Sequence, residues 1–501
     1  MKKIILLSAS LLCGILILVG FSAKKKEFSV ISKPAASIIN CLPAAAPTLI
    51  TAAAFKAKYE VDNIRVRKNV DALTTEEINA IKVGILKMRS LFYTDPTSMG
   101  YQIAIHGTTM TDNLPSWNSC HQANQSFFFF AWHRMYVYFF ERILRAKSGR
   151  SNLTLPYWNY QLNPVLHPAF RDNSRGNPLY DATRNPAINS GGALPASIMT
   201  AFSNSLDIIP YYNFQSNLNG GPHGSVHTTV NGNMAVVATA VKDPVFWLHH
   251  SNIDRLWEEW LSRCNGRINP TDSTWLNNTY TFFDEFGNPV SMNGSQVVAI
   301  ATQLNYRYDS LPTDPGCGAP AAPQSLVSSQ ELLSKSSAVE IQAPSQKTNF
   351  LQEPTGLLDS FIKKNKRTNF KFTSKTQPET LVMIFDGVTI DQMPQGVIEV
   401  YLNLPAAVTS PASNSKYFVG LLDLFSAEHH SMHILKAKEN KDRIQLDVSK
   451  AAQALNLTLN DLKNAEVSFF VRGVTLNGKE VPTAAQVTIQ HIKFFVDEFK
   501  R

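Results

Sequence analysis

Residues 243–257 read DPVFWLHHSNIDRLW, and this stretch decides the fold of the first half of the chain. Asp243 can accept hydrogen bonds from the free amides at the start of a helix, and Pro244 fits its first turn. Large apolar residues then follow on nearly every face, so the stretch predicts a buried helix. This helix carries two adjacent histidines, His249 and His250.

A second pair of histidines lies just upstream, in the sequence GPHGSVH of residues 221–227. His223 and His227 are four residues apart, which on a helix places both imidazoles on one face, able to hold one metal ion. The pair lacks the glutamate that follows the first histidine of a zinc protease, so that chemistry is excluded. A third ligand must come from elsewhere, and the helix that is predicted to start at Asp243-Pro244 and run to about Leu261 can supply it.

The surrounding region, residues 55–317, predicts a mainly helical domain. Residues 77–92 have the pattern of an amphipathic helix, and residues 127–145 that of a largely buried one. Residues 161–222 are rich in Asn, Pro, Ser and Gly, so we expect loops that wrap over the helices.

A second domain is expected after a change in composition. Residues 318–348 are dominated by Ala, Pro, Ser and Gln and are interpreted as a linker. Beyond it, β-branched and aromatic residues alternate or cluster between turn signals, which predicts strands in a β domain over residues 349–501. The four strand segments are residues 380–385, 397–402, 467–472 and 486–495. The fold class is therefore a multi-domain α+β protein, with a helical domain followed by a β-sandwich.

The start of the chain has the features of an export signal. Two lysines precede an apolar run that ends at Ala23, which predicts a signal over residues 1–23 and a periplasmic or extracellular location. The run is also long enough to span a bilayer, so an uncleaved membrane anchor stays an alternative. Residues 24–54 are interpreted as an extension that precedes the helical domain.

Charge and cysteine content narrow the function classes further. The net charge of +8 is modest for 501 residues and the basic residues are scattered, which excludes a nucleic-acid-binding surface as the leading interpretation. Four cysteines follow the predicted signal, and one or two disulfides are expected in an oxidising compartment, with the pairing left open. These are Cys41, Cys120, Cys264 and Cys317.

Three stretches together resemble the tyrosinase and catechol oxidase family of type-3 dicopper proteins. Residues 243–257 are similar to the family's second copper motif. Residues 101–106 and 127–136, followed by LPYWNY at 155–160, are similar to the first half of its site. The resemblance implies a four-helix core that holds two copper ions.

The resemblance also implies which histidines bind copper. His106 and His133 would be ligands of the first copper, and His223, His227 and His250 of the second. His249 would be a neighbour of the ligands. His167 shows no ligand spacing.

The middle ligand of the first copper departs from the family pattern. The family usually places it nine residues before His133, where this chain has Asn124. His121 lies twelve residues before and becomes the predicted ligand, because a loop with a three-residue insertion could still reach the metal. The alternative is an impaired first site.

Four further residues are candidates for tuning the site. Asp254 lies one turn beyond His250 and is expected either to orient an imidazole through a hydrogen bond or to form an ion pair with an arginine at the helix surface. By resemblance, Gly224 and Thr228 follow ligands where the family tunes deprotonation of the substrate. Asn219 stands where many members have a glutamate that assists hydroxylation of monophenols.

The implied activity is oxidation of o-diphenols to o-quinones by dioxygen, with hydroxylation of monophenols doubtful because the glutamate is missing. Six neutral imidazoles suit copper and argue against a di-iron bundle, which relies on carboxylates. Residues 381–499 resemble the β domain of plant polyphenol oxidases that covers the active site until it is removed. The alternative function is a haemocyanin-like oxygen carrier or a copper protein without turnover.

Overall fold

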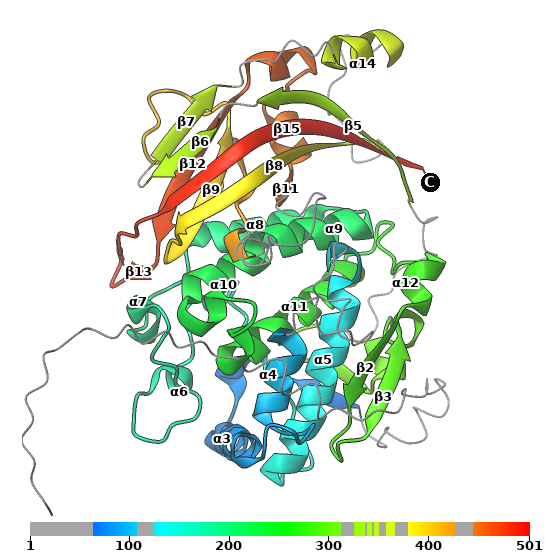
Figure 1. Ribbon diagram of the computed structural model, residues 1–501, viewed down its shortest axis with the longest axis vertical. Helices are drawn as coiled ribbons and strands as arrows, with labels where there is room; N and C mark the ends of the chain where they lie inside the picture. Colours follow the sequence, from blue (N-terminus) through cyan, green and yellow to red (C-terminus); the bar gives the residue numbers. More distant parts are fainter. Residues whose placement is uncertain are drawn as a thin grey trace, which may run out of the picture.

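The computed structural model describes residues 64–107, 125–311, 325–335, 338–342, 345–349, 357–365, 379–425 and 444–500. Helices fill the first part of the chain and long strands the last part. In Figure 1 the strands of the C-terminal domain lie above the helical domain. The expected fold class, a helical domain followed by a sheet-rich one, is confirmed.

The helical domain is built on four helices that carry the predicted copper ligands. They are α4 (Met99–Gly107), α5 (Gln125–Ser148), α10 (Gly224–Val230) and α11 (Val245–Ser262). Their apolar side chains form one buried cluster, in which Trp132, Trp247 and Trp257 are almost fully enclosed. Burial of this much aromatic surface supplies a large part of the driving force for folding.

The helices predicted from periodicity are confirmed with small shifts at their ends. Helix α3 (Thr75–Ser90) begins with a capping box between Thr74 and Glu77. In α11 the predicted cap is present, since the Val245 amide donates to Asp243 Oδ1 at 2.9 Å. Asp243 is also held by a buried, bidentate ion pair with Arg184.

The prediction that residues 161–222 are loops is wrong in part. The segment contains α8 (Ala196–Asp207) and α9 (Tyr211–Leu218), as well as the short helices α6 (Pro168–Arg171) and α7 (Pro186–Asn189). Helix α8 buries Ile198 and Phe202 against the domain core. Tertiary packing therefore outweighs the weak helix propensity of the Asn and Ser residues.

Helix α9 continues into α10 through a short π-helix, η2 (Asn219–His223). Pro222 lies inside this turn and has no N–H to donate. π-Helical turns are rare and are often found at functional sites. Here the turn places His223 at the start of α10.

A buried ionic network joins the two ends of the helical domain. Strands β1 (Arg65–Arg67) and β4 (Tyr306–Tyr308) pair in parallel. Arg67 of β1 forms ion pairs with Glu141 of α5 and Asp254 of α11, and its guanidinium lies 3.8 Å from the centroid of the Tyr306 ring. The network ties the first and last described strands of this domain to two helices of its core.

The C-terminal domain is a sandwich of two antiparallel sheets. One has the order β10-β9-β12-β7, and the other the order β11-β8-β15-β5 with β6 also paired to β15. Apolar side chains from both sheets form a second core, in which Phe385 and Phe469 meet edge to face. The expected β-sandwich is confirmed.

All four predicted strands are present in this domain. They are β8 (Glu379–Gln392), β9 (Gly396–Leu402), β12 (Glu466–Gly473) and β15 (Gln486–Lys500). Strands β10 (Phe418–Leu421) and β11 (Ile444–Asp447) also belong to the sandwich, and helices α14 (Leu357–Asn365) and α16 (Ser449–Ala454) accompany them.

The linker predicted over residues 318–348 is not what the structure shows where it describes this segment. Strands β5 (Ser325–Lys335), β6 (Val339–Gln342) and β7 (Ser345–Asn349) lie there and belong to the two sheets. Strand β5 pairs with β15, and β7 pairs with β12. The C-terminal domain therefore begins earlier than residue 349.

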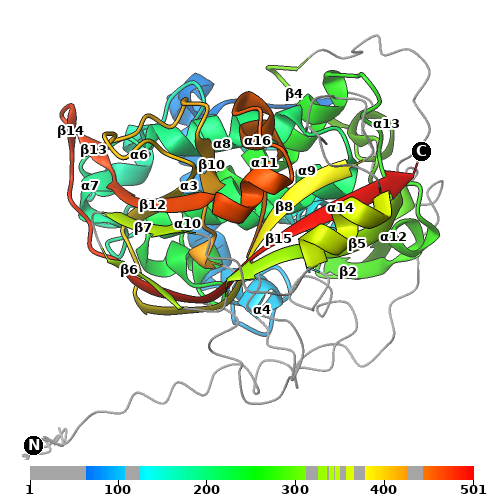
Figure 2. The same ribbon diagram turned by 90° about the horizontal axis from the view of Figure 1, so that it is seen from above.

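One sheet of the sandwich packs on the helical domain. Every residue of β9 is buried. Ile398, Val400 and Leu402 face the sandwich core, whereas the alternate residues Val397 and Tyr401 belong to the core of the helical domain. Strand β9 contacts α10 and β10 contacts α8, and seen from above β10 and β12 overlie helices of the first domain (Figure 2). The C-terminal domain thus covers the helices that carry the predicted second copper site.

The structure bears only in part on the predicted disulfides and on the predicted export signal. Cys264 is disulfide-bonded, which agrees with at least one bridge. Among the described residues, none of the helices is both long and apolar enough to cross a membrane. The predicted signal, residues 1–23, and the extension that follows it lie outside the described residues.

Candidate metal centre

Five of the six predicted ligands converge in the buried interior of the helical domain. His106 comes from α4, His133 from α5, His223 and His227 from η2 and α10, and His250 from α11. Each is at most 5% exposed. The sixth, His121, lies outside the described residues, as does Asn124.

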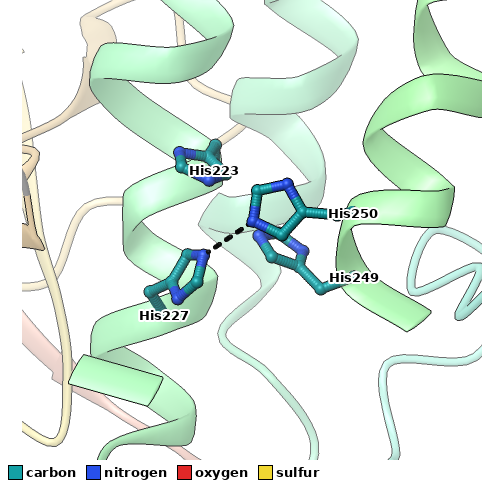
Figure 3. A group of neighbouring side chains, drawn as sticks. All are labelled: His223, His227, His249 and His250. Carbon is teal, nitrogen blue, oxygen red and sulfur yellow. Dashed lines mark hydrogen bonds between the residues drawn. The ribbon is translucent and has the colours of Figure 1, made fainter. Parts of the chain in front are cut away.

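His227 and His250 have the spacing of two ligands of one metal. Their Nε2 atoms are 3.3 Å apart and face one another (Figure 3). Two imidazole nitrogens bound to one metal at about 2.0–2.1 Å, at tetrahedral angles, lie about 3.3 Å apart. His223 completes the set, with its ring centroid 4.8 Å from that of His227 and 5.1 Å from that of His250.

The two described residues of the first site lie beside this set. The His106 and His133 ring centroids are 5.8 Å apart. The His133 ring stacks on the His250 ring at 4.4 Å with 11° between the planes. His250 therefore lies between the histidines of the predicted first and second sites.

Backbone carbonyls select the nitrogen that each ring presents. The Nδ1 atom lies 2.9 Å from a carbonyl oxygen in His106, His133 and His227, and 3.4 Å from one in His223. A carbonyl accepts hydrogen bonds, so Nδ1 carries the proton and Nε2 keeps its lone pair. This arrangement orients four Nε2 atoms for binding a metal.

The protonation states also suit a metal. Burial, and after it the neighbouring imidazoles, hold the pKa of His223 and His250 well below the usual value. Both rings are therefore neutral at neutral pH, which is the form that binds metals. Within the described residues, His223 Nε2 and His250 Nδ1 are buried with no hydrogen-bond partner. Such atoms are costly unless something binds them, and a set of imidazoles without a carboxylate suits copper.

His249 belongs to the same cluster, although the sequence assigned it as a neighbour. Ligand atoms of His223, His227, His249 and His250 all lie within 4.8 Å of one another. The His249 ring stacks on His223, with centroids 5.2 Å apart and planes at 9°. His250, however, is the one that meets His133 face to face. The stacking on His133 favours His250 over His249 as the ligand from α11, although His249 lies about as close to His223 and His227.

Aromatic rings enclose the cluster. Phe129 lies 4.6 Å from His133 and 4.8 Å from His223 between ring centroids. Phe246 lies 4.2 Å from His250 and 4.9 Å from His106. These rings exclude water and lower the local dielectric, which strengthens electrostatic interactions at the centre.

Among the described residues, no imidazole donates a hydrogen bond to Asp254, so the structure lends no support to the first of its two expected roles. Its Oδ1 accepts from Arg134 Nε at 2.5 Å, and its Oδ2 accepts from Tyr306, Tyr308 and Arg67. The second expectation, a pair with an arginine, is what the structure shows, except that the pair is buried instead of exposed. Because Arg134 follows His133 on α5, the pair fixes the spacing of α5 and α11, which both carry copper ligands.

The three predicted tuning residues lie where the C-terminal domain meets the helices. Asn219 accepts a hydrogen bond from His223 through its backbone oxygen. The Thr228 hydroxyl donates to the backbone oxygen of Gly396, on β9, at 3.3 Å. Gly224 touches the side chain of Asp423, just beyond β10. Asn219 thus contacts a predicted ligand, whereas Thr228 and Gly224 contact the C-terminal domain that covers the second copper site.

The sequence missed Phe425, which stacks directly on a predicted ligand. Its ring lies parallel to the His227 ring, with centroids 4.0 Å apart, and its edge meets His223 at 5.9 Å. Phe425 is 5% exposed and follows β10 in the C-terminal domain. The C-terminal domain therefore places an aromatic ring against the second copper site.

Comparison with known families supports the assignment from geometry. Residues 96–191 and 192–263 match the common central domain of tyrosinase, and residues 269–314 match the polyphenol oxidase middle domain. The matched residues include His106, His133, His223, His227 and His250.

Two curated proteins illustrate the level of similarity. A tyrosinase from Hahella sp. (strain CCB-MM4) is 32% identical over 282 residues, which cover 46% of this chain and 60% of that protein. The latent form of a chloroplastic polyphenol oxidase from Prunus armeniaca is 28% identical over 319 residues, covering 54% of this chain and 53% of that protein. The chain thus spans less than two thirds of the length of these relatives.

Solved structures share the fold across both domains. Latent apple tyrosinase superposes with a TM-score of 0.62 at 17% identity, covering 90% of this chain and all of that one. Recombinant latent aurone synthase, a polyphenol oxidase, gives 0.60 at 19% identity, covering 92% and 94%. The likeness includes the C-terminal sandwich, which the two family models, ending at residue 314, do not reach.

Proposed function

We propose that this chain, whose residues 96–263 match the common central domain of tyrosinase and residues 269–314 the polyphenol oxidase middle domain, is a dicopper oxidase. It uses dioxygen to convert o-diphenols to o-quinones. The observation that carries the proposal is the 3.3 Å separation of His227 Nε2 and His250 Nε2 inside a cluster of buried imidazoles.

The residues present fit two copper ions. His223, His227 and His250 would hold one ion, and His106 and His133 would hold the other together with His121. Bound copper supplies the redox chemistry, in which two o-diphenols lose two electrons and two protons each while one dioxygen becomes two waters. The protein holds the imidazoles neutral and correctly oriented, and its aromatic walls exclude bulk water.

Oxidation of o-diphenols is proposed in preference to hydroxylation of monophenols. An o-diphenol needs less help with deprotonation than a monophenol, and Asn219 offers an amide where a carboxylate would assist that step. The Asn219 side chain is 9% exposed and lies one helical turn before His223. No proton acceptor comes from this position.

We further propose that the full chain is latent. Phe425 lies parallel to the His227 ring at van der Waals separation, where the ring of a docked phenol would also stack. The substrate and the Phe425 ring cannot occupy this space together. Turnover therefore requires the C-terminal domain to move away or to be removed. Proteolysis within residues 325–349 is not needed for this.

The predicted location outside the cytoplasm also stays a proposal. It is supported by the basic start and apolar run of residues 1–23 and by the disulfide at Cys264, because disulfides persist in oxidising compartments. Cell fractionation of the tagged full chain tests it. Recovery of the protein in the cytoplasm with the N-terminal run intact would contradict the proposal.

A steady-state assay with catechol and with tyrosine, alongside a copper count per chain, tests the function. We expect two coppers, quinone formation from catechol and little from tyrosine, with faster turnover once Phe425 is removed. Two coppers with reversible oxygen binding and no quinone, even without Phe425, would favour the haemocyanin-like alternative.

A further inference from the structure

The two domains meet closely at Gly224 of the helical domain and Asp423 of the C-terminal domain. A Cβ atom placed on Gly224 would lie 1.8 Å from Asp423 Oδ1 and 2.6 Å from Asp423 Cγ. Contacts of this length do not occur in proteins, so any side chain at position 224 must displace the carboxylate. Asp423 is 1% exposed and has little room to yield.

Asp423 is coupled to the ring that covers the centre. The backbone amide of Phe425 donates to Asp423 Oδ1 at 3.0 Å. The same oxygen is the atom that lies against Gly224. Displacement of this carboxylate therefore breaks the bond that positions Phe425, and the stacking of Phe425 on His227 depends on it.

Other glycines on this surface do not have the same constraint. A Cβ on Gly220 would meet only the Gln445 backbone oxygen, at 3.8 Å, and one on Gly221 would meet the Leu421 backbone oxygen at 3.7 Å. Both are ordinary van der Waals distances. Along this face of η2 and α10, a side chain is excluded at position 224 and tolerated at its neighbours.

We propose that Gly224 sets the latency of this protein. Its missing side chain forms the socket into which Asp423 docks, and the docked Asp423 holds Phe425 over His227. The link to latency rests on the proposed function, whereas the socket itself is a contact between the two domains in this structure. This role differs from the one that the family resemblance implied for Gly224, which was to tune deprotonation of the substrate.

The test substitutes Gly224→Ala in the full chain, with Gly220→Ala as the matched control. Gly224 has ordinary helical dihedrals, φ −62° and ψ −31°, and alanine favours a helix more than glycine does. The substitution should therefore leave α10 intact. Hydrogen exchange of the backbone amides of residues 421–425 measures whether the segment has come loose.

We expect G224A to speed exchange of these amides by about tenfold or more, the range expected for overpacking a tight contact. G220A should leave their exchange within about twofold of the original protein, because ordinary surface changes have small effects. Equal exchange in the original protein and G224A would overturn the proposal. So would equal acceleration in G224A and G220A.

A second pair of variants tests whether Asp423 is the residue that is displaced. Asp423→Ala removes the colliding carboxylate and by itself loosens the segment through loss of the Phe425 bond. In this background, Gly224→Ala should add no further acceleration, since the atoms that collide are gone. A full additional tenfold increase would show that Gly224 acts through another contact and would overturn the proposal.

The exchange measurement separates this proposal from the proposed function. It requires no turnover and is made on the copper-free and the copper-loaded protein. If G224A loosens residues 421–425 yet neither G224A nor Phe425→Ala yields quinone, the socket is supported and the oxidase assignment fails. If G224A yields quinone while exchange is unchanged, Gly224 acts on the substrate and the socket is wrong.

Discussion

Phe425 of the C-terminal domain lies parallel to the imidazole of His227 in the helical domain, with ring centroids 4.0 Å apart and 10° between the planes. A stacked aromatic pair contributes about 0.5–1.5 kcal/mol beyond the area it buries. Phe425→Ala should therefore raise the initial rate of catechol oxidation by the full chain roughly tenfold.

The control for this prediction is Phe286→Ala, which removes a phenylalanine that is 78% exposed and should leave the rate unchanged. An oxygen electrode follows both variants. If Phe425→Ala has no effect although the protein holds two coppers, Phe425 does not limit access to the centre.

Copper content should respond to the second-site ligands one by one. His227→Ala removes one of the two nitrogens that are 3.3 Å apart, so the copper count should fall from two per chain to about one. His167→Ala is the matched control, because His167 accepts a hydrogen bond from the Ala169 amide as a helix cap and should not affect copper. Atomic absorption after dialysis gives the counts, and two retained coppers in His227→Ala would contradict the assignment.

The identity of the third ligand of the first copper is open to the same measurement. We propose that His121 binds this ion, so His121→Ala should leave one copper per chain and Asn124→Ala should leave two. The reverse outcome would assign the site to position 124. One copper in the unaltered protein would show that the first site is impaired.

Asp254 should matter for stability as much as for activity. Although burial acts to raise it, the guanidiniums of Arg134 and Arg67 hold the pKa of Asp254 below its usual range. Asp254→Asn removes one of two carboxylate partners from each buried arginine, since Arg67 keeps Glu141 and Arg134 keeps Glu258. The substitution should lower the free energy of unfolding by about 3 kcal/mol, the lower end of the range for breaking a buried ion pair.

Asp207→Asn is its control. Asp207 is 54% exposed and pairs with Lys450 and Arg263 at the surface, where such pairs contribute less than about 1 kcal/mol. Denaturant titration of the copper-free chains compares the two variants. Similar losses would mean that the buried network does not stabilise the helical domain.

The stability of the C-terminal domain should depend on pH through Asp447. Burial raises the pKa of Asp447 to about 6, against hydrogen bonds from Ser449, and the Asp497 carboxylate adds to the rise. An aspartate in an unfolded chain titrates near pH 3.9. The folded state thus binds the proton more tightly, and the stability gained from it is present below about pH 4 and lost as pH rises through about 6.

Asp447→Asn removes this dependence. The unfolding free energy of the original protein minus that of the variant should fall by on the order of 1–2 kcal/mol between pH 4 and pH 7. Denaturant titrations at four pH values across this range provide the difference. A difference that stays flat or increases with pH would show that Asp447 is not the titrating group.

The clustering of the histidines was predictable because part of their signal is local. His223 and His227 are one helical turn apart, and His250 lies in a helix whose start is marked by Asp243 and Pro244. The strands β8, β9, β12 and β15 were predictable for a similar reason, since their alternation is present within each segment. Such patterns depend on residues that are neighbours in sequence.

The remaining features depend on contacts between distant segments. Strand β5 has an unremarkable composition and is formed by pairing with β15, about 160 residues later. Helix α8 exists because Ile198 and Phe202 find a buried surface. Phe425 carries no local signal, because its role comes from the docking of one domain on the other. For Asp254 the local spacing was misleading. It lies four residues after His250, which suggested a bond to an imidazole, but its partners come from α5, β1 and β4.

Oxygen consumption by copper-loaded Phe425→Ala in the presence of catechol tests the central claim most directly, with His227→Ala added to the same chain as the negative control. The account predicts continuous uptake of one dioxygen for every two quinones formed, two coppers per chain, and loss of turnover when His227 is replaced. Two bound coppers that take up oxygen reversibly without forming quinone would contradict it.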